Sequence, residues 1–465
     1  MTNLSKESKM SCTRRECLRA GSLTALGAGL GFLSPEIFKS RLLANAVDEN
    51  AKLVFIFQRG GNDGINTVIP YGDPEYNTGN RPSLYIPPAR AIDLGNGFAR
   101  LHPSMAAMME IYDHPRLTGL DGPGNLAIIH RAGYAGQSKS HFDSQRYWET
   151  GMPGDPTFEE GMIYRQVALT MNPMENSLVA AAMSSSRIVA LQGPLPIPTI
   201  QDPETFTFSG DPVEVSKFIG QLPSTPQGLD GCGLLGTYGG PGDFPDKPYR
   251  DLVYGTGLAL TDAMSIVQDA VAQGPYEPSE GAVYPAGSFG ERLAQIAMLL
   301  KRTPARVLGV NIGGWDTHTN QGQITGRQAN LLRQVAQGYR ALFRDLHEQW
   351  DKLIVVTMTE FGRTSKENGS AGTDHGHAGV MFVAGGRVRG GVYNCDAATW
   401  SEGDLFSDNE RYVSRRTDFR AVFGEIFTRH FGDSRDVLEQ VIPSYTEAAR
   451  DNPGDFESLN FLPET

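Results

Sequence analysis

Carboxylate and imidazole side chains gather at a few points of this 465-residue sequence. The candidates are Asp63, Asp316, His318, Glu360, Asp374, His375 and His377. Asp316 and His318 stand two positions apart, and residues two apart in extended backbone face the same side. A mixed set of carboxylates and imidazoles suits Zn²⁺, Mn²⁺ or Fe better than Mg²⁺ or Ca²⁺, which prefer oxygen ligands. The residue types therefore indicate a site for one or two divalent metal ions, with Zn or Mn as the expected metal.

A histidine beside an aspartate is also a common hydrogen-bonded pair in ordinary loops, so each pair alone is weak evidence for a metal. Several pairs at predicted strand ends make a shared polar site the better interpretation. The histidines outside these segments are expected to be structural or surface residues; they are His102, His114, His130, His347 and His430.

A third candidate segment contains a hydroxyl group beside a histidine, in Ser140-His141-Phe142-Asp143. Ser140 and Asp143 fit a capping box at the start of a predicted helix. A hydroxyl at a helix N-terminus also sits where backbone N–H groups attract an anion, and a nearby metal would activate it as a nucleophile. Ser140 and His141 are the catalytic candidates, but the spacing does not decide between capping and catalysis.

Arginines near these segments are candidates for holding an anionic substrate. Arg59 and Arg363 lie closest in sequence to the proposed ligands, and Arg131 follows a predicted strand. Common signatures of other enzyme classes are missing: the sequence has no Gly-x-Ser-x-Gly elbow, no P-loop and no dinucleotide-binding Gly-x-Gly-x-x-Gly that opens a helix after a strand.

Short apolar runs separated by helical patterns supply the elements that would position these side chains. We expect strands at 52–57, 126–129, 188–191, 306–312, 353–358 and 380–384. We expect helices at 101–117, 252–271, 289–300 and 328–350. This alternation predicts an α/β fold with a doubly wound, mostly parallel sheet and helices on both faces. Ligands bind outside the carboxyl ends of such strands, where Asp63, Asp316 and Glu360 would converge.

The first 46 residues have the composition of an export signal. They carry seven Lys or Arg and three Asp or Glu, the pair Arg14-Arg15, a mild apolar run to Leu33 and the small-x-small sequence Ala44-Asn45-Ala46. This pattern predicts a twin-arginine signal peptide, with the export machinery as a partner and a periplasmic or secreted location. Four glycines weaken the apolar run, so we expect no stable membrane span.

The rest of the chain, residues 47–465, is expected to form one large α/β domain. A stretch rich in Gly, Pro and Asp, roughly 202–290, is expected to be a loop-rich insertion or cap. The full chain has a net charge of −12, and without residues 1–46 it has 34 basic and 50 acidic side chains, a net charge of −16. This acidity argues against broad nucleic-acid binding. Cys232 and Cys395 remain after the signal and are too few for a metal cluster by themselves.

Taken together, the motifs resemble one known family. The motifs are Arg59-Gly60-Gly61-Asn62-Asp63-Gly64, Ser140-His141-Phe142-Asp143, Gly313-Gly314-Trp315-Asp316-Thr317-His318, Thr359-Glu360-Phe361-Gly362-Arg363-Thr364 and Gly372-Thr373-Asp374-His375-Gly376-His377. This ordered series is similar to that of the domain-of-unknown-function 1501 family, over nearly the whole chain after the signal. Members of that family resemble the alkaline phosphatase and sulfatase superfamily, which implies a doubly wound sheet with two metals at its strand ends.

The superfamily resemblance implies roles for individual residues. Asp63 matches the metal-binding aspartate after the first strand, and Ser140 falls near the Ser/Thr nucleophile. Asp316 and His318 resemble the Asp and His ligands of one metal, and His375 or His377 would supply the late histidine. Phe361 is a departure, because relatives carry Asp-His where this chain has Glu360-Phe361, so one metal site is expected to be weakened, rebuilt or lost.

The resulting hypothesis is an exported metal-dependent hydrolase of phosphate or sulfate esters. Metal would orient a small-molecule or polymer ester, and Ser140 or an activated water would attack it. The absence of a Cys/Ser-x-Pro-x-Arg motif argues against a formylglycine sulfatase. The alternative is a non-catalytic periplasmic binding protein on the same fold with a degenerate metal site, an alternative that Phe361 motivates.

Overall fold

The computed structural model describes residues 50–115, 123–208 and 248–464. Its central strand is β1 (Lys52–Arg59), in which every residue from Leu53 to Gln58 is buried. Successive side chains of a strand point to opposite faces of a sheet. Accordingly, Leu53, Phe55 and Phe57 pack into one hydrophobic cluster while Val54 and Ile56 pack into another. A strand that is apolar on both faces must be covered on both faces, and this requirement sets the architecture.

The described residues form a nine-stranded central sheet in the order β11-β5-β10-β9-β1-β8-β6-β7, with β12 also paired to β5. The other bounds are β5 (Leu126–Gly133), β6 (Ala180–Met183), β7 (Thr199–Ile200), β8 (Val307–Gly313), β9 (Leu353–Met358), β10 (Gly379–Ala384), β11 (Gly391–Tyr393) and β12 (Thr417–Asp418). Only the two pairings made by β10 are antiparallel in this sheet. The prediction of an α/β fold with a mostly parallel sheet is confirmed.

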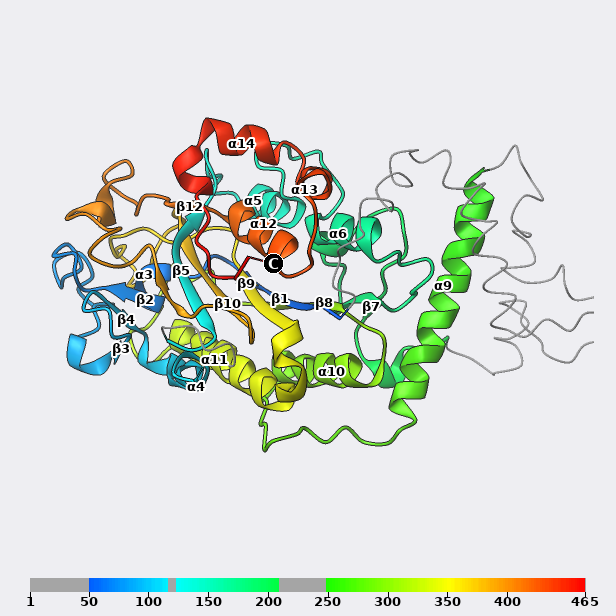
Figure 1. Ribbon diagram of the computed structural model, residues 1–465. Helices are drawn as coiled ribbons and strands as arrows, with labels where there is room; N and C mark the ends of the chain where they lie inside the picture. Colours follow the sequence, from blue (N-terminus) through cyan, green and yellow to red (C-terminus); the bar gives the residue numbers. More distant parts are fainter. Residues whose placement is uncertain (1–49, 116–122, 209–247, 465) are drawn as a thin grey trace, which may run out of the picture.

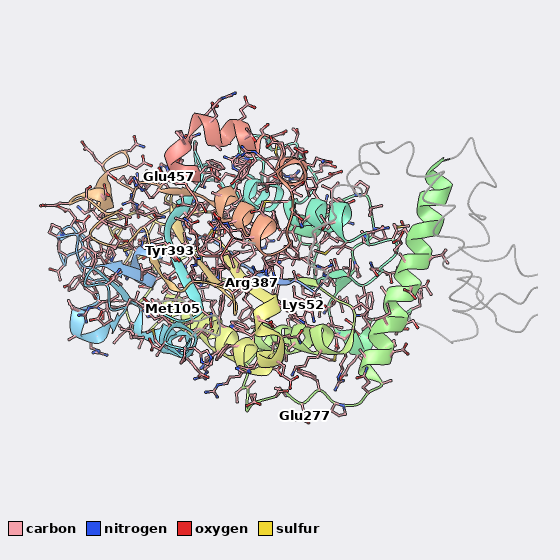
Figure 2. The ribbon with its side chains drawn as sticks, viewed as in Figure 1. Lys52, Met105, Glu277, Arg387, Tyr393 and Glu457 are labelled. Carbon is pink, nitrogen blue, oxygen red and sulfur yellow. The ribbon has the colours of Figure 1, made fainter. Side chains whose placement is uncertain are left out.

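Helices cover the sheet on both sides (Figure 1). One side carries α5 (His141–Thr150), α6 (Met162–Thr170), α12 (Phe419–Arg429), α13 (Arg435–Val441) and α14 (Tyr445–Asp451). The other carries α4 (Met109–Tyr112), α10 (Ser288–Arg302), α11 (Arg327–Asp345) and the 3₁₀ helix η3 (Pro103–Met108). Met105 of η3 packs into the core on that side (Figure 2). The chain therefore buries two apolar layers, one on each face of the sheet.

Smaller elements complete the described chain. An antiparallel sheet in the order β2-β4-β3 consists of β2 (Val68–Pro70), β4 (Ala99–Leu101) and β3 (Ile92–Asp93), and the short helix α3 (Gly64–Thr67) precedes it. The remaining 3₁₀ helices are η2 (Pro88–Arg90), η4 (Val189–Leu191), η5 (Pro203–Thr205), η6 (His347–Lys352), η7 (Asp404–Phe406) and η8 (Pro453–Phe456).

Two expected elements are wrong in the structure. The apolar segment 188–191 is the 3₁₀ helix η4, and the neighbouring strand is β6, whose sequence is Ala-Ala-Ala-Met. The alanines of β6 lie between β8 and β7, where small side chains suffice because the strand is covered on both sides. The helix expected over 101–117 is shorter and divided, since β4 ends at Leu101 and only η3 and α4 follow it up to Tyr112.

The predicted insertion is described only in part, because residues 209–247 lie outside the described residues. The part that the structure describes includes the 24-residue helix α9 (Pro248–Val271), which stands beyond the β7 edge of the sheet (Figure 1). The segment between α9 and α10 is attached to the end of α11. Its Tyr276 Oη and Tyr284 Oη donate hydrogen bonds to Asp345 at 2.8 and 2.6 Å. This segment therefore packs against the main domain.

The predicted signal peptide, residues 1–46, also lies outside the described residues, as does Cys232. Cys395 is buried with a free thiol. Among the described residues, every helix is too short or too polar to cross a membrane.

Candidate metal centre

Five loops meet at one edge of the central sheet. The strands β1, β5, β8 and β9 run in the same direction and end there, and antiparallel β10 begins there. Gly60 and Gly61 after β1 have φ angles of +124° and +81° and allow these loops to approach closely. A Cβ on Gly60 would lie 2.4 Å from the backbone N of Asp316, and one on Gly61 would lie 2.4 Å from the ring of Phe361. These close approaches bring the sequence-predicted segments together.

Three side chains at this edge offer ligand atoms that all lie within 4.8 Å of one another: His141, Asp316 and His375. Nε2 of His141 is 3.5 Å from Oδ2 of Asp316, and Nε2 of His375 is 3.2 Å from its Oδ1. His318 joins them, because its Nε2 lies 3.1 Å from Asp316 Oδ1 and 3.0 Å from His375 Nε2. These four residues, from here on the metal cluster, present three imidazole nitrogens to one carboxylate.

The other nitrogen of each imidazole is held by a hydrogen-bond acceptor of the protein. Nδ1 of His141 lies 2.9 Å from Glu360 Oε1, Nδ1 of His318 lies 3.0 Å from Asp374 Oδ1, and Nδ1 of His375 lies 2.7 Å from the carbonyl oxygen of Lys139. Carboxylates and carbonyls accept hydrogen bonds, so in a neutral ring held in this way Nδ1 carries the proton and the lone pair lies on Nε2. Such acceptors fix the tautomer and orientation of metal-binding histidines.

The donor set therefore fits a metal ion. Two Nε2 lone pairs 3.0 Å apart would repel each other unless a proton or a cation lay between them. Three imidazoles with one carboxylate suit Zn²⁺, and imidazole–carboxylate sets also bind Mn²⁺ and Fe. The cluster is open to solvent, since the side chains of Asp316 and His318 are 43% and 40% exposed. A small ligand or substrate can reach it.

Glu360 contacts this cluster from the buried side. Its side chain is fully buried, and Oε1 accepts hydrogen bonds from the backbone N of Gly60 at 2.7 Å and from Gln145 Nε2 at 3.0 Å, besides contacting His141. The hydrogen bond to Glu360 raises the pKa of His141. Oε2 of Glu360 is buried and has no hydrogen-bond partner. Glu360, predicted as a metal ligand, thus contacts the cluster by orienting His141.

Arg363, which was predicted to hold a substrate anion, is buried and gives its hydrogen bonds to the protein. Its Nε donates to Gly61 O at 2.8 Å, and its other nitrogens donate to the carbonyls of Gly60, Trp315 and Thr373. It also pairs with Asp316 Oδ1 at 2.8 Å. Burial opposes ionisation of Asp316, but this guanidinium outweighs it and lowers the pKa to about 2. Arg363 therefore ties the loops together and keeps Asp316 ionised.

The other predicted anion-binding arginine is likewise paired. Arg59 forms a salt bridge with Glu149 at 2.9 Å and donates to Gln145 Oε1 at 2.9 Å. Arg131, considered with it, pairs with Asp404 at 2.7 Å. Each of these guanidinium groups therefore has a close carboxylate partner within the protein.

Two predicted ligands lie apart from the metal cluster. Asp63 is fully buried and forms a salt bridge with Arg81 at 2.7 Å, and it accepts a further hydrogen bond from Gln321 at 2.7 Å. Burial opposes its ionisation, but the Arg81 charge lowers the pKa of Asp63 below its ordinary value. His377 instead pairs with Asp408 and stacks on Tyr412 with ring centroids 4.1 Å apart. Both have partners that already satisfy them.

Ser140 is the N-cap of α5, and its Oγ accepts a hydrogen bond from the backbone N of Asp143 at 3.4 Å. The capping interpretation is therefore confirmed, and it leaves the hydroxyl proton uncommitted. Phe361 is fully buried, and its ring centroid lies 5.0 Å from that of His141 and 4.5 Å from that of His375. Phe361 thus packs against two imidazoles of the cluster.

Sequence reasoning placed His141 beside Ser140 as a catalytic candidate and missed its place among possible metal ligands. It also missed Arg81 and Gln145, because arginines and glutamines in loops carry no pattern that marks them. The signal available for His141 was its position after a strand of the parallel set, the same signal that marked Asp316.

A family model described as "Protein of unknown function (DUF1501)" matches residues 255–438. The matched part contains Asp316, His318, Glu360 and His375, and the segment with His141 precedes it. No curated protein and no solved structure matches the chain.

Proposed function

We propose that this protein is a metal-dependent hydrolase of phosphate or sulfate esters, exported through a twin-arginine signal in residues 1–46. The carrying observation is the metal cluster: three imidazoles, each with Nδ1 held by an acceptor, directed at one ionised carboxylate. The mostly parallel sheet with helices on both faces, and the gathering of these residues at its strand ends, support an alkaline-phosphatase-like fold as part of this proposal.

A bound Zn²⁺ or Mn²⁺ would supply Lewis acidity toward an ester oxygen. The protein's own residues hold and orient the reacting groups. His141, Asp316 and His375 are the ligands we assign, with His318 as the fourth. Glu360 and Asp374 fix the rings of His141 and His318, so the site is organised before substrate arrives. Arg363 keeps the carboxylate of Asp316 ionised.

Hydrolysis breaks the bond between the phosphorus or sulfur and the ester oxygen, and the leaving alcohol takes a proton. The attacking oxygen is that of water or of Ser140, which is adjacent in sequence to His141. If Ser140 attacks, its proton passes to the leaving alcohol, and water then cleaves the serine ester to release phosphate or sulfate and restore the hydroxyl. Because Arg59 and Arg363 are neutralised by protein partners, the negative charge of the substrate would be balanced chiefly by the metal.

The second candidate function is metal-dependent binding without catalysis. Two observations favour it: Ser140 has a structural role as a helix cap, and the second acidic position, Asp63, is closed by Arg81. Such a protein would hold an anionic ligand on the metal and release it unchanged.

Metal analysis of the purified full chain tests the proposal with a matched pair of variants. His375→Ala removes a cluster ligand, whereas His377→Ala removes a histidine two positions away that pairs with Asp408. We expect about one metal ion per chain in the unaltered protein and in His377→Ala, and a loss of affinity of at least about 100-fold in His375→Ala, since loss of an outer-shell partner alone costs 10–100-fold. Equal metal content in both variants would contradict the assignment.

A panel of phosphate and sulfate monoesters and diesters, assayed with added Zn²⁺ or Mn²⁺, separates hydrolase from binding protein. Turnover that is lost in His375→Ala and kept in His377→Ala supports the hydrolase. Ser140→Ala then identifies the nucleophile: loss of turnover at unchanged metal content indicates attack by Ser140, and retained turnover indicates attack by water. Metal and ester binding without turnover of any ester would support the binding protein.

A further inference from the structure

A second feature lies away from the metal cluster, where α11, η3 and the end of η2 line a solvent-open cavity of about 480 Å³. Three arginines line it, Arg90, Arg333 and Arg340, and its lining includes no Asp or Glu. The remaining walls are small or neutral and include Ala106, Ala107 and Ile324. The cavity therefore combines strong positive charge with a short apolar surface.

The arginines approach the cavity from two sides. Arg333 and Arg340 stand seven residues apart on α11, which places them on the same face two turns apart, with Gln337 between them. At 1.5 Å rise per residue their Cα atoms are separated by about 10 Å along the helix axis. Arg90 is the last residue of η2 and lines the same cavity from another part of the chain. Three guanidinium groups thus face one space from separate anchor points.

None of these three arginines forms a salt bridge with a residue that the structure describes. Arg333 donates a hydrogen bond to the neutral side chain of Asn330 at 2.8 Å. The contrast is Arg344, one turn beyond Arg340 on the same helix, whose guanidinium binds both oxygens of Glu110 at 2.6 and 2.8 Å. The chain has a net charge of −12, so acidic residues are plentiful elsewhere. Positive charge left unneutralised around one cavity is the arrangement expected of an anion site.

We propose that this cavity binds an organic anion with at least two acidic groups, of the size of a sugar bisphosphate or an acidic disaccharide. Guanidinium groups pair with phosphate, sulfate or carboxylate through two parallel hydrogen bonds. Two arginines about 10 Å apart along the helix engage separate acidic groups of one ligand better than a single small ion. The volume lies within the range of about 300–1,000 Å³ that is usual for small-molecule sites.

The alanine and isoleucine walls fit the carbon skeleton between the acidic groups. No residue of the metal cluster lines the cavity, so this site is independent of the proposed hydrolase activity. Its failure and the failure of the proposed function are therefore separate results.

Isothermal titration of the full chain with fructose 1,6-bisphosphate and with a sulfated, uronic-acid-containing disaccharide tests the proposal. Glucose serves as the neutral control and inorganic sulfate as the single-anion control. We expect one ligand per chain for at least one of the two organic anions and at least tenfold weaker binding of sulfate. Preference for the bisphosphate or for the disaccharide identifies phosphate or sulfate and carboxylate as the acidic groups.

Variants locate the binding. Arg333→Gln and Arg340→Gln should each weaken binding at least tenfold, and Gln337→Glu, which keeps all three arginines, should weaken it by placing an acid in the cavity. Arg187→Gln is the matched control, because Arg187 is exposed, has no salt bridge among the described residues and lies outside the cavity. Binding should persist in His375→Ala, which separates this site from the metal cluster.

Three results would overturn the proposal. These are no binding of either organic anion at millimolar concentration, equal weakening in Arg187→Gln and the cavity variants, or binding that disappears in His375→Ala alone. Thermal unfolding of each variant confirms that it is folded, which is the expected outcome because Arg333 is exposed and Arg340 partly exposed.

Discussion

Two aspartates follow adjacent parallel strands, yet the structure gives them opposite surroundings. Asp63 comes after β1 and is fully buried against Arg81, whereas Asp316 comes after β8 and has a side chain that is 43% exposed and faces three imidazoles. Both carboxyl groups have a lowered pKa, and in both a guanidinium contributes to the shift. The difference lies in whether an oxygen remains available. Arg81 and Gln321 satisfy Asp63, while Oδ2 of Asp316 still faces solvent and His141.

This contrast shows that position at a strand end brings an acidic group to the functional edge without deciding its role. The neighbour supplied by another part of the chain decides it. Arg81 lies 18 residues after Asp63, in a loop without helical or strand periodicity, and donates to its Oδ2 at 2.7 Å. We call Asp63 with Arg81 the closed pair. We call Asp316 with the three imidazoles that it faces the open group. Both lie at the same edge of the sheet.

The largest effect is expected from breaking the closed pair. Arg81→Met removes the guanidinium and leaves the carboxylate of Asp63 buried without a charge partner, which costs about 3–5 kcal/mol of the free energy of unfolding. Urea denaturation measures it. Arg411→Met is the control, because Arg411 forms an exposed pair with Asp374 at 3.4 Å, and such pairs are worth about 0–1 kcal/mol. A loss below about 1 kcal/mol for Arg81→Met would erase the distinction between the two aspartates.

The same pair predicts a dependence of stability on acid. Burial raises the pKa of Asp63, and the charge and hydrogen bonds of Arg81 outweigh that and lower it from 3.8. A lowered pKa in the folded state contributes stability above the unfolded-state value, and the contribution is lost as the pH falls below about 4. Unfolding free energies measured from pH 6 to pH 3 should fall more steeply in the unaltered protein than in Asp63→Asn. Parallel curves would show that Asp63 is not an ionised partner of Arg81.

The open group is tested by weakening the hydrogen bond that orients one imidazole, while every proposed metal ligand is kept. Glu360→Gln preserves the shape of the side chain but removes the charge that accepts the proton of His141 Nδ1. We expect a 10–100-fold loss in Zn²⁺ affinity, the usual cost of losing an outer-shell partner, with a smaller change in stability than in Arg81→Met. Competition with a chelating dye measures the affinity. Unchanged affinity would mean that His141 is not a metal ligand.

Much of the fold was accessible from the sequence because β1, β8, β9 and β10 are continuous apolar runs bounded by turns. The strand β6 escaped prediction, since its three alanines carry a weak apolar signal beside the stronger run at 188–191. At the site, the residue types of Asp316, His318 and His375 and their positions at strand ends were sufficient to predict that these side chains lie close together. The pairing of Asp63 with Arg81 and of His377 with Asp408 depends on loop conformation, which local pattern does not specify.

The smallest effect is expected at the residue that joins the two regions. Gln321 donates to Asp63 Oδ2 at 2.7 Å and accepts from the hydroxyls of Thr317 at 2.9 Å and Thr373 at 2.7 Å. Thr317 lies between Asp316 and His318, and Thr373 lies two residues before His375, so one amide connects the closed pair to both loops of the metal cluster.

Gln321→Ala should cost about 1–3 kcal/mol of stability, since it leaves buried polar groups without a partner, and should weaken Zn²⁺ binding less than tenfold. The weakening is small because Arg363 and the Nδ1 acceptors still hold the ligands in place. Denaturation and dye competition on the same preparation measure both quantities. A loss of metal affinity as large as that in Glu360→Gln would mean that the closed pair determines the geometry of the open group, and the two regions would then be one structural unit.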